Sequence, residues 1–90
     1  MAWLTRDEVK DIVCDSLNEI GNFNGDCEEI LIAEIEDVYK LDFCDAIQNR
    51  MDERGFEVDL SLNDDTSGIN NMNKISSLID YVRVNQMRAI

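Results

Sequence analysis

The chain of 90 residues contains no histidine and no proline, and it has only 8 lysines and arginines against 20 aspartates and glutamates. Histidine is the side chain most often used as a general base and as a zinc ligand. Its absence argues against catalysis by this chain alone, so we expect a protein that is not an enzyme. Without proline there is no proline-rich linker, and the 44% hydrophobic content suits a single domain over residues 1–90.

Long apolar runs are missing as well. No run is long enough to cross a membrane, and the first residues pass directly into charged ones without an apolar leader. The formal charge of -12 disfavours nucleic acid and membranes as partners and favours proteins with basic surfaces. Acidic residues are concentrated between Asp26 and Glu53, where only Lys40 and Arg50 oppose them. We expect a monomer that meets such partners through this acidic segment.

Cysteine is scarce, because Cys14, Cys27 and Cys44 are odd in number and widely spaced. Without a leader, this usage predicts reduced thiols in a cytoplasmic protein, buried as small apolar side chains. Carboxylates surround Cys44 in the sequence, and negative charge raises the pKa of a thiol. Cys44 is therefore predicted to be inert.

Apolar residues recur at helical spacing in three segments. The first begins with Thr5 and Glu8, which have the spacing of a capping box, and it ends at a glycine-rich turn after Ile20. Ile75, Leu78, Ile79 and Val82 give the last segment its apolar stripe. The expected helices are residues 5–20, residues 41–55, and a third that opens near Asn71 or Asn73 and frays after Asn85.

The connections between these helices are less regular. Residues 26–40 are expected to hold a short helix or turn in a long ordered loop, although the apolar run 30–32 also fits a strand. Residues 56–60 alternate apolar and acidic side chains, so they are expected to be extended and half-buried. Residues 63–68 form a polar loop with room for one helical turn. Together these elements predict an all-α fold, a small antiparallel four-helix bundle, with Trp3 packed over its end.

Several stretches are similar to segments of acyl carrier proteins and follow in the same order. They are VKDIV at 9–13, LDFCDAI at 41–47, RMDERGFEV at 50–58 and ISSLIDYV at 75–82. The resemblance covers most of the chain. It implies a four-helix carrier fold whose acidic second helix docks on synthases and transferases.

In that family, a serine at the start of the second helix carries 4′-phosphopantetheine, whose thiol bears acyl groups. This chain has no serine at the matching position. Matching residues 41–47 to the family's Leu-Asp-Ser-Leu-Asp-x-Ile motif puts Phe43 there, and a gap-free match anchored on Phe56 puts Asp42 there. Ser16, within a literal Asp-Ser-Leu, is disfavoured because it falls inside the first expected helix and not at a helix start. We therefore predict no prosthetic group.

Two function classes remain open. The resemblance implies an acyl-carrier-like domain, without the 4′-phosphopantetheine arm, that binds a synthase or acyltransferase. The alternative is a small acidic inhibitor, such as an immunity protein that neutralises a basic nuclease toxin. Tyr39 and Phe43 could form an aromatic contact for a partner, or they could fill the gap between the loop and the second helix. The candidate docking residues are Asp42, Phe43, Asp45, Asp52 and Glu53.

Two acidic clusters resemble cation sites only in part. Residues 63–68 begin like a calcium loop, but Asn70 stands where an EF-hand has an apolar residue and Lys74 where it has a glutamate. Asp26, Glu28 and Glu29 fit an exposed charged face better than a metal site. No bound metal is predicted.

Overall fold

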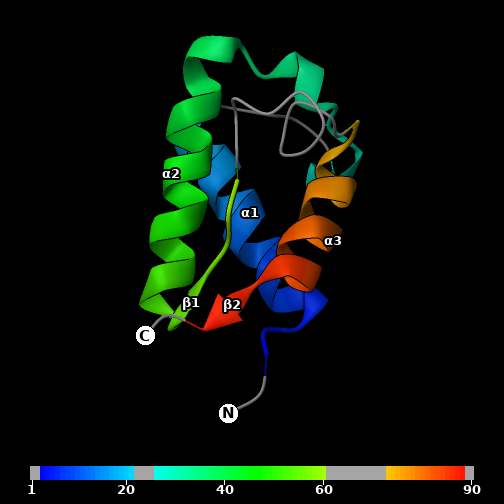
Figure 1. Ribbon diagram of the computed structural model, residues 1–90. Helices are drawn as coiled ribbons and strands as arrows, with labels where there is room; N and C mark the ends of the chain where they lie inside the picture. The colour runs from blue at the N-terminus through cyan, green and yellow to red at the C-terminus, as the bar shows by residue number, and fades with distance from the viewer. Residues whose placement is uncertain (1–2, 22–25, 61–72, 89–90) are drawn as a thin grey trace.

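The computed structural model describes residues 3–21, 26–60 and 73–88, and most of these residues are helical (Figure 1). Three α-helices surround one core, and a two-stranded antiparallel sheet closes the lower end of the molecule in the view of Figure 1. In chain order, the elements are α1 (Arg6–Ile20), the 3-10 helices η1 (Cys27–Glu29) and η2 (Ile32–Glu34), α2 (Asp37–Glu53), β1 (Phe56–Glu57), α3 (Ile75–Asn85) and β2 (Met87–Arg88).

The prediction of a small helical protein is confirmed, but the described residues hold three α-helices and not four. In residues 26–40, where a short helix or turn in a long loop was expected, the structure has the two 3-10 helices η1 and η2 and then the first turn of α2. Residues 56–60 are extended with buried apolar and exposed acidic positions, as predicted. Their partner β2 was not anticipated, and it pairs Phe56 with Arg88 and Glu57 with Met87. The loop 63–68 lies outside the described residues.

The start of α1 follows from its capping box, which the structure confirms. The Thr5 Oγ1 accepts a hydrogen bond from the Glu8 backbone N–H at 3.3 Å. The Glu8 carboxylate accepts one from the Thr5 backbone N–H at 3.1 Å. Two backbone donors that lack a partner within the helix are thereby satisfied. The helix then buries the stripe Val9, Ile12, Val13, Ser16 and Leu17.

Helix α2 begins four residues earlier than predicted, at Asp37 instead of Leu41. Glu36 is its N-cap, and the Glu36 carbonyl accepts a hydrogen bond from the Tyr39 backbone N–H at 2.9 Å. Apolar spacing could not locate this start, because Val38 and Leu41 are exposed and do not belong to the buried stripe. The core stripe of α2 begins only at Phe43.

The core lies where the inner sides of the three helices meet. Helices α1 and α2 pack against each other, and α3 packs against α1 and η1. Burying each large apolar side chain contributes about 1.5–3 kcal/mol relative to leaving it in water, so these stripes dominate the stability. The core side chains of α2 are Phe43, Cys44, Ile47 and Met51, and those of α3 are Ile75, Leu78, Ile79 and Val82.

A disulfide joins Cys14 on α1 to Cys27 in η1, with 5.9 Å between the two Cα atoms. The prediction of three reduced thiols is therefore wrong for this pair. The disulfide places η1 beside α1, and sequence spacing did not reveal this contact. Cys44 is a free, buried thiol, as predicted. The cysteine argument for a cytoplasmic location no longer holds, because disulfides persist mainly in oxidising compartments. Among the described helices, none has the length and apolar character of a membrane span.

The two ends of the described chain are tied together by one buried side chain, that of Gln86. Its Oε1 accepts a hydrogen bond from the Leu4 backbone N–H at 3.0 Å, and its Nε2 donates to the Leu4 carbonyl at 3.0 Å. The Nε2 also donates to the Arg83 carbonyl at 2.8 Å. Trp3 packs against Phe56 with 5.6 Å between ring centroids, so it lies over the end of the helices as predicted.

Candidate functional site

The side of α2 that faces away from the core carries a continuous row of exposed side chains, which we call the outer face of α2. Helical geometry places residues three, four and seven positions apart on one side. Val38 and Leu41, near the start of the helix, are 69% and 58% exposed. Carboxylates and one amide continue the row toward the end of the helix. The outer face consists of Val38, Leu41, Asp42, Asp45, Asn49, Asp52 and Glu53.

Four of the five predicted docking residues lie together on this face, and one does not. Asp42, Asp45, Asp52 and Glu53 are all exposed. Phe43 is 0% exposed, because its position points its ring into the core, and its assignment to the docking face was wrong. The alternative interpretation, in which Phe43 fills the interior next to the second helix, is the one the structure supports for this ring. Tyr39, its companion in that prediction, is exposed.

Arg50, in the last turn of α2, and Arg54, directly after the helix, do not pair with the carboxylates of the outer face. The Arg50 Nη1 lies 2.6 Å from the Glu19 Oε2, and the Arg54 Nη1 lies 3.6 Å from the Glu8 Oε2, so both guanidinium groups turn toward α1. Within residues 3–21, 26–60 and 73–88, none of the four outer-face carboxylates forms an ion pair. Unpaired carboxylates on one rigid helix make a local anionic surface.

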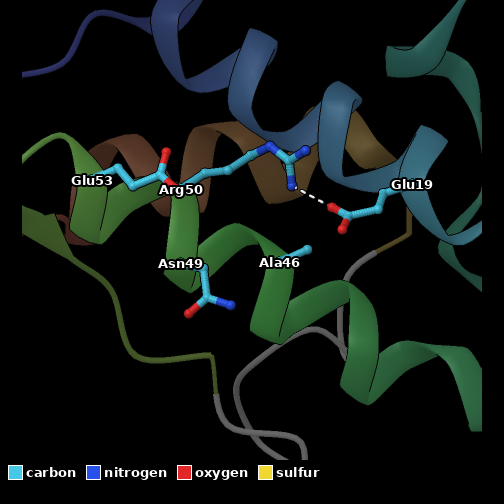
Figure 2. Close-up of a pocket in the computed structure, with 5 residues that line it drawn as sticks. All are labelled: Glu19, Ala46, Asn49, Arg50 and Glu53. Carbon is cyan, nitrogen blue, oxygen red and sulfur yellow. Dashed lines mark hydrogen bonds and ion pairs between the residues drawn. The ribbon is translucent and has the colours of Figure 1, made fainter.

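A shallow polar pocket borders this face where α2 meets α1. Figure 2 shows Arg50 reaching from α2 to Glu19 on α1, while Asn49 points away from this pair. The pocket holds about 290 Å³ and is lined by Glu19, Ala46, Asn49, Arg50 and Glu53. It offers no cysteine, serine or other activated nucleophile. We interpret it as the edge of the outer face.

Neither position that matches the family's attachment serine lies at a helix start. Asp42 and Phe43 both fall in the second turn of α2, because the helix begins at Asp37. No serine or threonine stands anywhere between Leu17 and Leu60. Both the matched positions and the actual start of α2 therefore lack a serine or threonine hydroxyl.

Ser16, the disfavoured alternative, is also buried. Its side chain is 0% exposed, and its Oγ donates a hydrogen bond of 2.7 Å to the Ile12 carbonyl. The Arg50 Nη1 approaches the same oxygen at 3.4 Å. A modifying enzyme needs access to the hydroxyl it acts on, so this burial is a second argument against Ser16.

The acidic residues of η1 are occupied by ion pairs with lysines and an arginine. The Glu28 carboxylate lies 2.6 Å from the Arg6 Nη2 and 3.2 Å from the Lys10 Nζ, and these hydrogen bonds lower the pKa of Glu28. Glu29 pairs with Lys74 at 2.9 Å. In the described part of the chain, no group of three or more potential metal ligands comes together. The calcium-like loop 63–68 is not among the described residues.

The buried thiol of Cys44 is poorly suited to chemistry. It is 2% exposed, and burial, assisted by the negative charge of Asp45, raises its pKa from 9.0 to about 11. A thiol with such a pKa is almost entirely protonated at neutral pH, and the protonated form is a weak nucleophile.

The exposed aliphatic pair Val38 and Leu41 was not found from the sequence. A signal was present, because both residues are apolar and three positions apart, yet neither fits the spacing of Phe43, Ile47 and Met51. Large apolar side chains left in water at a defined position are typical of interaction surfaces. They lie at the N-terminal end of the outer face, before the predicted acidic residues, and make that end apolar.

Comparison of the chain with protein-family models, curated proteins and solved structures gives no match.

Proposed function

We propose that the protein is a non-enzymatic docking domain, similar to an acyl carrier protein without its prosthetic arm. Its outer face of α2 binds a basic surface on a partner such as a synthase or an acyltransferase. The observation that carries this proposal is the outer face itself. Unpaired carboxylates and two exposed aliphatic side chains share one side of one helix, and the opposite side of the same helix is held in the core.

The two kinds of side chain serve different parts of binding. Long-range attraction between the carboxylates and lysines or arginines of a partner accelerates encounter and fixes orientation. Val38 and Leu41 contribute to the bound state, because apolar area removed from water contributes roughly 25 cal/mol per Å² before the costs of association. Binding is therefore expected to weaken with salt but not to vanish at high ionic strength.

A second candidate function is a small acidic inhibitor, such as an immunity protein against a nuclease toxin. The lack of a serine or threonine between Leu17 and Leu60 favours keeping this candidate, because an inhibitor needs no attachment site. Both candidates use the same face. They differ in the identity of the basic partner.

The deciding experiment identifies what touches the outer face in cells. A photo-crosslinking amino acid at Asp45 should trap the partner, and mass spectrometry of the adduct identifies it. The same amino acid at Asp11, an exposed position on α1, is the matched control. A synthase or acyltransferase trapped from Asp45 but not from Asp11 supports the adaptor, and a nuclease trapped in the same way supports the inhibitor. Equal trapping from both positions contradicts docking through α2.

The absence of an arm has its own test. The protein is incubated with coenzyme A and a phosphopantetheinyl transferase, and the intact mass is measured with an authentic carrier protein as positive control. We expect no change in mass. A phosphopantetheine adduct would overturn the arm-free version of the proposal and would locate the attachment residue after proteolysis.

A further inference from the structure

A second exposed apolar surface lies at the end of the molecule where the sheet is found, and we call it the end surface. Three segments contribute to it: the residues before α1, the last turn of α3, and β2. Trp3, Val84 and Met87 are 52%, 66% and 50% exposed. A hollow of about 370 Å³ lies among Trp3, Leu4, Arg83, Val84 and Gln86. Trp3 and Val84 thus leave apolar area in water beside this hollow, whereas Met87 lies on the other side of the two-stranded sheet from Arg88.

The end surface is held in place before anything binds. The Gln86 side chain fixes the Leu4 peptide on one side and the last turn of α3 on the other. The Trp3 ring lies against Phe56, and the Arg88 guanidinium lies over it at 5.0 Å from the ring centroid. A surface with fixed side chains loses less conformational entropy on binding than a mobile one.

The end surface carries two arginines although the whole molecule is acidic. Arg83 lines the hollow, Arg88 lies over Trp3, and the Arg83 guanidinium forms no ion pair within the described chain. The carboxylate of Asp80, one turn before Arg83, is held by the Arg6 Nε at 2.8 Å. Glu57 pairs with Met87 and lies with it on the other side of the sheet from Arg88. The surface therefore suits a ligand that combines aliphatic side chains with carboxylates.

The chain itself carries such a ligand at the start of α2. Val38 and Leu41 provide the aliphatic side chains, and Asp42 and Asp45 provide carboxylates one helical turn away. Figure 1 shows the start of α2 at the upper end of the molecule and β2 at the lower end. The two surfaces of one molecule are thus at opposite ends and can meet only between two copies.

We propose that the protein associates head to tail, with the start of α2 of one copy seated on the end surface of a second copy. Each copy keeps one surface of each kind free, so the contact is heterologous and continues into short open chains. The overall charge opposes association. It is screened beyond about 8 Å at physiological ionic strength, whereas the local contact is between opposite charges. The contact is therefore expected to be weak and visible only at high concentration.

This inference departs from the monomer expected from composition. It also does not depend on the external partner, because both surfaces belong to this chain. If both proposals hold, the second copy and the partner compete for the start of α2. Loss of self-association with retained partner binding would remove this inference alone, and the reverse result would remove only the docking function.

The test uses two variants that each lose one surface. Leu41→Arg introduces a cation at the start of α2, which would be repelled by Arg83 and Arg88 on the end surface of the other copy. Val84→Asp places a carboxylate in the apolar part of the end surface. Both positions are exposed, so the core is untouched. Circular dichroism verifies the fold, and Arg83→Glu, which reverses a charge at the hollow, is a second variant of the end surface. Asp11→Lys on α1 is the control that keeps both surfaces.

Sedimentation velocity up to about 1 mM protein is the measurement. The wild type and the Asp11→Lys control should show a mean mass that rises with concentration. Each surface variant alone should stay monomeric. A mixture of Leu41→Arg and Val84→Asp should form a heterodimer and stop there, because its two remaining ends are inactive. A wild type that stays monomeric throughout, or a mixture that stays monomeric while the wild type associates, would overturn the proposal.

Discussion

Both sides of α2 carry apolar residues, but the two sides differ in how far those residues are exposed. Its inner side carries Phe43, Ile47 and Met51, all 0% exposed, and its outer face carries two aliphatic residues among unpaired carboxylates. Apolar residues are thus present on both sides, but only those of the inner side stabilise the fold. The difference shows that apolar character alone does not assign a residue to the core. Val38 and Leu41 lie outside the core, and in our proposal they contribute to binding.

Phe43→Ala should give the largest effect. Removing a fully buried phenylalanine costs about 3–5 kcal/mol of the free energy of unfolding, because contacts are lost and a cavity remains. Leu41→Ala, two positions away on the outer face, should change that free energy by less than about 0.5 kcal/mol. Urea unfolding followed by circular dichroism measures both. Equal losses of the free energy of unfolding at the two positions would contradict the assignment of Phe43 to the core and of Leu41 to the outer face.

The disulfide that fastens the segment leading to α2 should give the next largest effect. Cys14 and Cys27 are 13 positions apart, and closing a loop of about this length stabilises a protein by about 3 kcal/mol. The double variant Cys14→Ser, Cys27→Ser should lose about that amount. The wild type in a reducing agent should unfold at the same urea concentration as the variant. No difference between oxidised and reduced wild type would show that this link does not form in solution.

Cys44 tests the inner side by chemical reactivity. Its pKa of about 11, against 9.0 for an exposed thiol, reduces the thiolate at neutral pH by about 100-fold. The native, oxidised protein should therefore react with a thiol reagent at least about 100-fold more slowly than the unfolded protein. With a reagent that releases a coloured product, the absorbance gained on unfolding should correspond to one thiol per molecule. Rapid reaction in the native state would place this part of α2 at the surface.

Glu28 should produce a smaller effect that depends on pH. Hydrogen bonds from Arg6 and Lys10 lower its pKa in the folded state below 4.5. Its contribution to stability is complete above the unfolded value and is lost as the pH falls through the folded one. Glu28→Gln should therefore flatten the fall of stability below about pH 4.5. Glu53→Gln, which removes an outer-face carboxylate, is the control. A curve identical to the wild type would show that these ion pairs do not form.

Charge reversal on the outer face should have the smallest effect on stability. Asp45→Lys with Asp52→Lys replaces exposed charges without ion pairs, so the free energy of unfolding should change by less than about 0.5 kcal/mol. The same variant should bind the crosslinked partner more slowly and with a weaker dependence on salt. Asp11→Lys should leave the association rate nearly unchanged. Unfolding of the Asp45, Asp52 variant would mean that the outer face belongs to the core.

Local signals in the sequence predicted the parts of the fold that depend on local interactions. The Thr5 and Glu8 box, the stripe of the last helix and the alternation of residues 56–60 are each determined within a few residues. The features that were missed need contacts between distant segments. β2 exists because Met87 and Arg88 meet residues 56–57, and the disulfide exists because Cys27 in η1 lies beside Cys14 on α1.

The candidate site was predicted in part for a similar reason. The acidic residues of α2 could be found by counting charge, and all four predicted carboxylates are exposed. Phe43 has the four-residue spacing of Ile47 and Met51, which already places it on the inner side, so its assignment to the docking face went against a signal in the sequence. Val38 and Leu41 were overlooked because the helix was expected to begin at Leu41 and not at Asp37.

Trp3 is the only tryptophan in the chain, and it lies against Phe56 and beneath Arg88. Its fluorescence is therefore an optical reporter of one end of the molecule, separate from the helical signal of the whole. A partner bound along the outer face of α2 should leave the emission wavelength unchanged. Binding of a second copy at the end surface would exclude water from the indole and shift the emission to the blue. A single fluorescence measurement can therefore distinguish a partner complex from self-association.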